Sequence, residues 1–372
     1  MTTENRAVPE RRDNSLNLVR LVLALMVLVS HAYAITGHGD EPTWQGKTLG
    51  TWAVYGFFAL SGFLITGSRV GSPFGSYLVR RIARIYPGFL ACLVVTITVF
   101  APIAYAKQHH GLGGYLTTSD WPLNYVVNNL TLKVFGGTVA GTLSDAPFPG
   151  IWNGSLWTLY YEFMCYLIVG TLLALPFMRR RPLLLAPVFV GSVVFLAHPE
   201  WIQTYFGGHL DVIFLTPLLP FFLGGSVVWL LRDAIPLHWY VALPAAGVFV
   251  GAVLWREAWG GQAAAPLLAI VLLWLGQVLP SPAWIRRNDL SYGAYVYAFP
   301  VQQLVVLLGL GVTPFANMVT AAIGTGLFAA ASWFVVERPA MRSIRGSISG
   351  VDVTLHHDHR EPARQPAAAA AS

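Results

Sequence analysis

The stretch LVRLVLALMVLVSHAYAI, which runs from Leu18 to Ile35, is apolar almost throughout but carries Arg20 and His31. An apolar run of this length can cross the hydrocarbon core of a membrane as an α-helix. A helix turns about 100° and rises about 1.5 Å per residue, so this spacing puts both side chains on one face, roughly 16 Å apart. Asn17 lies near the same line. Because lipid does not tolerate such a stripe, we expect it to face protein or water.

The composition extends this expectation to the whole chain. Of 372 residues, 55% are hydrophobic and 11% are charged, whereas a soluble protein carries about 25% charged residues. Apolar runs recur along the chain and predict an all-α, polytopic membrane protein. We expect ten transmembrane helices, at residues 16–36, 50–68, 88–106, 151–176, 183–197, 211–231, 238–255, 263–280, 290–311 and 313–336.

The basic residues predict the orientation of these helices. With the N-terminus in the cytoplasm, 19 of the 23 Lys and Arg residues fall on inner segments, as the positive-inside rule requires. An even number of spans puts both termini in the cytoplasm. We therefore expect a cytoplasmic tail over 1–15, a membrane domain over 16–340 and a disordered cytoplasmic tail over 341–372. The tail contains HHDHR at 356–360, which we interpret as disordered chain, and we expect no metal site.

Polar side chains inside the other spans are candidate site residues. Glu162 falls within the fourth span, and a buried carboxylate needs a cation, so we expect it to pair with His31 or with Arg81 or Arg84. Ser61 lies among glycines of the second span, which favour close helix packing. Three arginines, Arg80, Arg81 and Arg84, follow that span. They fit either anchoring at the inner surface or binding of a phosphate-bearing ligand.

His31 is the only one of ten histidines that we expect deep in a span. A lone histidine there either satisfies a hydrogen bond between helices or accepts a proton during catalysis. The outer segment 107–150 is long enough for a substrate groove, although a solvated loop is equally compatible with it. Aromatic candidates for lining a site are Trp157, Tyr161, Tyr292 and Tyr295.

Four motifs in order resemble those of the acyltransferase family 3 membrane enzymes. The family's basic residue, ten residues and histidine are matched by Arg20 and His31. An FFxLSGFLI phrase is matched over 57–65, RxxRIxP over 81–87, and SLWTLxxEF over 155–163. A later SYxxYLWHxP phrase is matched only in part, because Tyr297 and Ala298 stand where its Trp and His would be. Any role of that second histidine therefore does not transfer to this chain.

The resemblance implies a ten-helix enzyme that transfers an acetyl or other acyl group from acetyl-CoA or another acyl-CoA. The implied acceptor is a hydroxyl of a glycan, a glycolipid or a glycosylated small molecule such as a macrolide. Acyl-CoA would be a substrate, with no permanently bound cofactor and no nucleic-acid partner. His31 would be general base or transient acyl carrier, assisted by Glu162. The implied donor site comprises Arg20, Arg80, Arg81, Arg84 and Ser61. The implied acceptor or site-lining residues are Asn17, Trp157, Tyr161, Tyr292 and Tyr295.

We expect the protein in the plasma membrane, as an inner-membrane protein of a bacterium. The rival interpretation is a transporter or flippase for a glycan or lipid-linked substrate, because such proteins also carry intramembrane charges and helix-breaking glycines. The absence of an evident inverted repeat in the sequence favours the enzyme.

Overall fold

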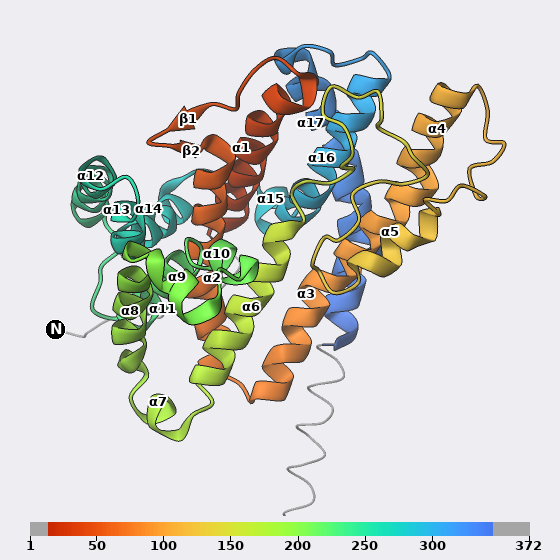
Figure 1. Ribbon diagram of the computed structural model, residues 1–372. Helices are drawn as coiled ribbons and strands as arrows, with labels where there is room; N and C mark the ends of the chain where they lie inside the picture. Colours follow the sequence, from red (N-terminus) through yellow and green to blue (C-terminus); the bar gives the residue numbers. More distant parts are fainter. Residues whose placement is uncertain (1–13, 345–372) are drawn as a thin grey trace, which may run out of the picture.

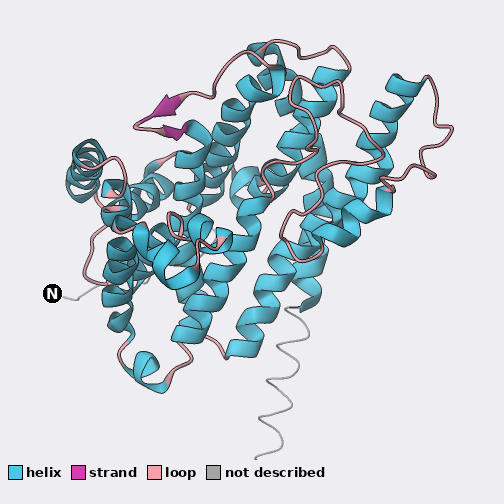
Figure 2. Cartoon of the chain, viewed as in Figure 1, coloured by secondary structure: helices cyan, strands magenta, loops and turns pink. Residues whose placement is uncertain are grey.

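The computed structural model describes residues 14–344 as a helical protein (Figures 1 and 2). The strands among these residues form one short antiparallel hairpin, β1 (Thr43–Trp44) and β2 (Lys47–Thr48). Most of the predicted N-terminal tail and nearly all of the predicted C-terminal tail, with the HHDHR run, lie outside the described residues. The all-α prediction is confirmed for the described part of the chain.

Four described helices are long and apolar enough to cross a membrane, at 16–36, 49–70, 74–109 and 314–344. A helix pair bent by 102° near residue 198 would make a fifth. Three further apolar helices are shorter than 18 residues. These helices support a membrane protein, while the number of ten spans and the side of the termini stay predictions.

The helices follow the apolar runs of the sequence, but most of them begin and end at other residues than the predicted spans. The long helices are α1 (Leu16–Thr36), α2 (Leu49–Val70), α3 (Phe74–Val95) with η1 (Thr96–Phe100) and α4 (Ala101–His109), and α17 (Pro314–Ser332) with η3 (Trp333–Glu337). Between them lie α5 (Pro122–Asn129), α6 (Trp157–Leu172), α7 (Pro176–Arg180), η2 (Pro182–Leu184), α8 (Leu185–Ala197), α9 (Glu200–Phe206), α10 (Leu210–Leu215), α11 (Leu219–Leu230), α12 (Trp239–Trp255), α13 (Gly260–Ala263), α14 (Ala265–Val278), α15 (Ala283–Arg287) and α16 (Ser291–Leu307).

Two predicted spans differ from the helices that occupy them. Hydropathy predicts that the third begins at residue 88, yet α3 begins at Phe74 and continues through Pro87. Hydropathy locates only the apolar part of a helix, and the arginine-bearing turns before it are helical without being apolar. The predicted sixth span is continuous over 211–231, but the chain there is broken between α10 and α11. Pro217 lies in that break, and a proline interrupts the backbone hydrogen bonds of a helix interior.

Helices α2 and α11 cross at backbone contact. A Cβ atom on Gly62 would lie 1.8 Å from the carbonyl oxygen of Phe222, and one on Gly225 would lie 1.9 Å from that of Ala59. Neither position has room for a side chain. The expectation that small residues make the second span a close-packing helix is therefore confirmed.

The arrangement of the helices gives the molecule two distinct ends (Figure 1). The hairpin end carries β1, β2, the far end of α4 and the turn between α16 and α17. The opposite end carries α7 and the beginning of α3. Helix α1 packs against α2, α16 and α17 and runs toward the hairpin end. In the predicted topology the hairpin end faces outward.

We predict that Gly62→Ala lowers the thermal unfolding midpoint of the detergent-purified protein. The added methyl must separate two packed backbones, and overpacking of this kind costs about 1–3 kcal/mol. Gly191→Ala in α8 is the matched control, because no atom lies within 4 Å of the position that a Cβ would take there, and alanine favours a helix over glycine. Equal midpoints for the two variants would contradict the packing argument.

Candidate active site

A narrow cavity lies where α1, α2, α6 and α16 meet. Its volume is about 30 Å³, which is room for about two water molecules. Its wall is lined by Arg20, Val54, Phe57, Phe58, Thr158, Leu159, Glu162, Ser291, Tyr292 and Tyr295. Four of the candidate residues from the sequence, Arg20, Glu162, Tyr292 and Tyr295, therefore share one cavity although they come from three helices.

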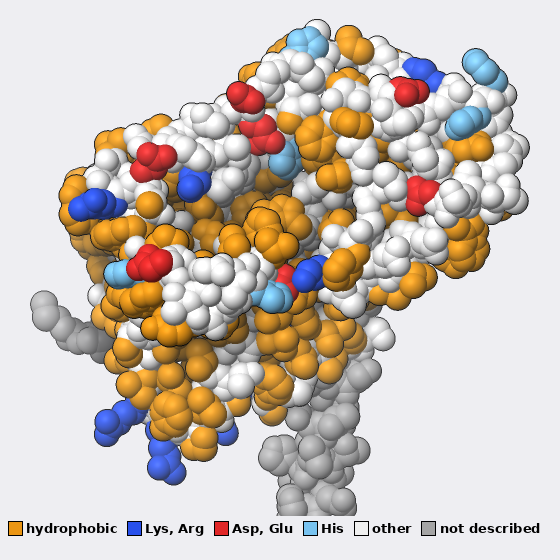
Figure 3. Space-filling model, in the orientation of Figure 1, with side chains coloured by type: hydrophobic (Ala, Val, Ile, Leu, Met, Phe, Trp, Pro, Cys, Tyr) orange, Lys and Arg blue, Asp and Glu red, His pale blue; other side chains and the backbone are white. Residues whose placement is uncertain are grey.

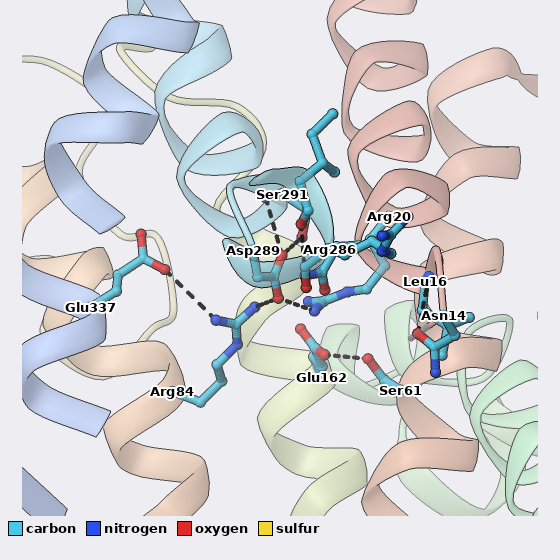
Figure 4. A network of polar contacts seen from close by, with 12 residues as sticks. Asn14, Leu16, Arg20, Ser61, Arg84, Glu162, Arg286, Asp289, Ser291 and Glu337 are labelled. Carbon is cyan, nitrogen blue, oxygen red and sulfur yellow. Dashed lines mark hydrogen bonds and ion pairs between the residues drawn. The ribbon is translucent and has the colours of Figure 1, made fainter. Parts of the chain in front are cut away.

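Glu162 is held by hydroxyl groups and not by a cation. Its Oε1 accepts hydrogen bonds from Ser61 Oγ at 2.7 Å and from Tyr166 Oη at 2.6 Å. No hydrogen bond or ion pair joins it to His31, Arg81 or Arg84, so the predicted pairing is wrong. The physical reason is local: α2 and the next turn of α6 supply two donors to one carboxylate oxygen. The carboxylate nevertheless points toward the Arg20 guanidinium across the cavity (Figure 4).

Asp289, just before α16, connects the two arginines nearest the cavity. Its Oδ2 lies 2.5 Å from Arg20 Nη1 and 2.5 Å from Arg84 Nη2, while Ser291 donates to Oδ1 from its hydroxyl at 2.5 Å and its backbone N–H at 3.2 Å. Burial raises the pKa of Asp289, but the charges of Arg20 and Arg84 outweigh it and hold that pKa below its usual value. Glu337 from η3 lies 3.8 Å from Arg84 Nη1. Figure 4 shows this network from close by.

The two other arginines of the predicted donor site form no ion pair with a described carboxylate. Arg81 has a buried Nε that finds no hydrogen-bond partner among the described residues, and Arg80 is partly buried. Arg20 and Arg84 are paired with carboxylates. Arg81, in contrast, has a hydrogen-bond donor without a described partner and lies beside the helices that line the cavity.

His31 is paired with a glutamate that the sequence analysis did not single out. Its Nδ1 lies 2.8 Å from Oε1 of Glu41, in the connection between α1 and β1. Ser30 donates its hydroxyl to Oε2 of the same carboxylate and accepts the N–H of Gly50 at 2.9 Å. Burial raises the pKa of Glu41, but the hydrogen bonds and charge of His31 and the hydroxyls of Ser30 and Thr48 bring it below its usual value.

His31 lies in α1, which has the same bounds as the predicted first span. It is five residues from the end of α1, and its side chain is 21% exposed. The ring of Phe299 packs against it edge-on at 5.2 Å between ring centroids. The imidazole therefore lies near the hairpin end of α1, away from the cavity that Arg20 lines. The shared helix still sets the two groups about 16 Å apart along its axis.

The remaining candidates either hold helices together through hydrogen bonds or lie outside the cavity. Asn17 donates its amide to the carbonyls of Ile285 and Arg286 at 3.1 and 3.0 Å, which ties α1 to α15. Tyr292 donates to the carbonyl of Ile85 at 2.7 Å. A second tyrosine, Tyr295, donates to the carbonyl of Ser155 at 3.0 Å and lies 2.5 Å from the Thr158 hydroxyl. The aromatic pair Trp157 and Tyr161 lies instead at the hairpin end of α6, outside this cavity.

Sequence reasoning missed Glu41, Asp289 and Glu337. Each lies just outside or at the end of an apolar run, where the sequence does not distinguish it from an ordinary acidic loop residue. The available signal was the scarcity of acids, since the chain has only 17 Asp and Glu residues. An acidic residue at the edge of an apolar run was therefore a candidate partner for Arg20, His31 or Arg84.

Comparisons with known proteins identify a family and two relatives. The model of the acyltransferase domain family matches residues 13–337. An O-acetyl transferase of Shigella phage Sf6 is 28% identical over 348 residues, which cover 88% of this chain and 96% of that protein. Nodulation protein 10 of Rhizobium leguminosarum bv. viciae is 28% identical over 363 residues, covering 88% of this chain and 93% of the relative. No solved structure matches the chain.

We predict that Asp289→Asn destabilises the protein by about 3 kcal/mol, because it removes the carboxylate from two partly buried guanidinium groups and leaves only Glu337, 3.8 Å from Arg84. Thermal unfolding in detergent measures the loss. Asp233→Asn is the matched control: Asp233 is 77% exposed and pairs only with its neighbour Arg232 at 3.2 Å, so its effect stays within about 0.5 kcal/mol. Equal effects of both changes would show that the network does not hold the helices together.

Proposed function

The chain belongs to acyltransferase family 3, and on that premise we propose that it moves an acyl group from acyl-CoA to a hydroxyl of a carbohydrate or of a glycosylated small molecule. That the protein is an acyltransferase is confirmed by the family match and by the relative named an O-acetyl transferase. The observation that carries the proposed chemistry is the His31–Glu41 pair at the hairpin end of the helix that also holds Arg20 at the cavity.

The pairing assigns the two imidazole nitrogens different roles. With a carboxylate 2.8 Å from Nδ1, that nitrogen carries the proton and donates it, which leaves Nε2 as the free acceptor. Nε2 takes the proton of the acceptor hydroxyl as its oxygen attacks the thioester carbonyl. Collapse of the tetrahedral intermediate breaks the C–S bond, and the leaving thiolate takes the proton from the imidazolium. Glu41 orients the ring and stabilises the imidazolium, in the role that the resemblance implies for Glu162.

Glu162 instead belongs to the donor path in this proposal. It faces Arg20 across a cavity with room for about two waters, so the arm of a donor enters only when the surrounding side chains move. Arg81 supports a phosphate contact in this proposal, because its Nε has no partner among the described residues, although the atom is buried and an anion reaches it only when neighbouring side chains move. Arg80 lies on the same helix. A cytoplasmic donor would then reach from these arginines along α1 toward His31.

The predicted topology places the His31 end of α1 outward, at the plasma membrane of a bacterium. The apolar helices and the family support a membrane location. A hydroxyl that reaches His31 from that side would be acylated by a donor that enters from the other side. The acceptors compatible with the proposal are glycans, glycolipids and glycosylated small molecules.

We predict that His31→Ala abolishes acyl transfer by the purified protein, with a loss of unfolding midpoint similar to that of Glu41→Gln, because both changes break the same pair. Loss of a general base costs about 10²–10⁴ in rate. Arg20→Ala removes a partner of Asp289 and lowers both the transfer rate and the unfolding midpoint. The assay measures free thiol released from acetyl-CoA in the presence of a sugar acceptor. Full turnover by His31→Ala protein overturns the mechanism, and a pure carrier gives no thiol release in any variant.

We predict that Glu41→Gln lowers the transfer rate about 10–100-fold, since partners that orient a reactive histidine have effects of this size. Glu257→Gln, an exposed carboxylate near the hairpin, leaves the rate unchanged. The sign of the pH effect follows from the lowered pKa of Glu41. Its pairing stabilises the folded protein above the usual glutamate value of 4.5 and is lost as the pH falls below it. The stability difference between wild type and Glu41→Gln therefore disappears on acidification.

A further inference from the structure

A second group of side chains lies at the hairpin end of α6, outside the cavity and the His31–Glu41 pair. Trp157 and Tyr161 from α6 and Phe214 from α10 form an aromatic cluster, which we call the aromatic platform. Trp157 lies 5.4 Å from Phe214 and 5.6 Å from Tyr161 between ring centroids. The side chains of Trp157 and Phe214 are 39% and 44% exposed. The platform thus presents ring surface that no other part of the described chain covers.

A charged pair borders the platform. Lys133, from the segment after α5, lies 2.8 Å from Asp211 Oδ1, and Tyr161 donates its hydroxyl to that same oxygen at 3.2 Å. The Lys133 ammonium also lies over the rings of Tyr160 and Phe135, at 5.6 and 5.5 Å. Both ends of the pair remain reachable, since the Lys133 and Asp211 side chains are 35% and 24% exposed. Figure 3 shows charged groups set within hydrophobic surface over α10.

The combination of these groups has a definite chemical preference. Exposed ring faces take up the C–H faces of a sugar ring, while a fixed carboxylate accepts hydrogen bonds from hydroxyls and an ammonium donates them. Aromatic residues that only anchor a protein at the membrane interface need no ion pair fastened to their rings. An ion pair that only links two segments of the chain needs no exposed aromatic rings beside it. Both features together match a site for a polyhydroxylated, uncharged ring.

The chain places this site next to the reaction path. Trp157 directly precedes Thr158 and Leu159, which line the cavity, and Glu162 follows one turn later on α6. A ligand on the platform therefore lies at the outer mouth of the helix group that carries the donor path. Gly154, three residues before Trp157, lies against the ring of Phe299, which packs edge-on against His31.

We propose that the aromatic platform with the Lys133–Asp211 pair binds a pyranose unit of the acceptor and presents it from the hairpin end. The proposal rests on the proposed function and adds where the acceptor binds. It makes Trp157 a stacking residue and Asp211 a hydrogen-bond acceptor for sugar hydroxyls, neither of which takes part in bond breaking.

The test measures sugar binding separately from catalysis. Saturation-transfer NMR on the detergent-purified wild type, without donor, uses methyl glycosides of neutral hexoses and 6-deoxyhexoses as probes. We expect binding of at least one glycoside, weakened about tenfold by Trp157→Ala and by Asp211→Asn, the loss of one good contact each. Trp157→Phe retains a ring and restores most of the binding. Trp239→Ala, which removes a 61% exposed tryptophan on α12, is the matched control and leaves binding unchanged.

The kinetic arm separates this proposal from the proposed function. With the bound glycoside as acceptor, Trp157→Ala raises the KM for that glycoside about tenfold, while Trp239→Ala leaves both this KM and the rate of acetyl-CoA hydrolysis in the absence of acceptor at the wild-type values. No glycoside bound by the wild type, or equal binding by wild type and Trp157→Ala, overturns the acceptor site. A loss of stability in lipid nanodiscs without a change in sugar binding would also overturn it, and would identify a membrane anchor. Failure of the proposed function has a different signature: glycosides bind, yet wild type cleaves no acetyl-CoA.

Discussion

The bridge from Asp289 to Arg20 and Arg84 sets the relative positions of three helices, and the candidate site is built on those positions. Two guanidinium groups on α1 and α3 meet in the interior of a helical bundle, where an unpaired charge costs several kcal/mol. The Asp289 carboxylate lies 2.5 Å from each, and Glu337 lies 3.8 Å from Arg84. Because Asp289 directly precedes α16, the same contact fixes α16 relative to α1 and α3. Two of these helices, α1 and α16, contribute Arg20 and Ser291, Tyr292 and Tyr295 to the lining of the cavity.

Helix α1 then relates the two ends of the proposed reaction path. Arg20 at the cavity and His31 beside Glu41 lie on one rigid element, so their separation is set by helix geometry and not by side-chain flexibility. The polar stripe on α1 is compensated at both ends, by Asp289 at one and by Glu41 at the other. Between them the helix is mostly apolar and packs against α2, α16 and α17. Both costly residues of this helix are therefore paired.

The helices themselves could be predicted from hydropathy to a useful degree. Nearly every apolar run became a helix, and the glycines of α2 do make a close contact with α11. The errors have local causes: α3 is longer than its apolar part, and the run over 211–231 is broken at Pro217. Four of the candidate residues line one cavity, and their roles stay predictions. The predicted partner of Glu162 was wrong, because this carboxylate accepts hydrogen bonds from hydroxyl groups, while His31 pairs with Glu41.

The sequence alone shows which charged and polar groups need a partner, because an apolar helical chain has Arg20 and His31 on one face of its first helix. The sequence alone also shows four motifs that resemble those of one enzyme family. These are properties of composition, periodicity and spacing, which act within a single segment. Which groups provide the compensation depends on the packing of the whole chain. Asp289 lies 269 residues from Arg20 along the chain, and Lys133 meets Asp211 from another segment. An ion pair depends on distance in space, which the packing of separate helices sets and no single segment encodes.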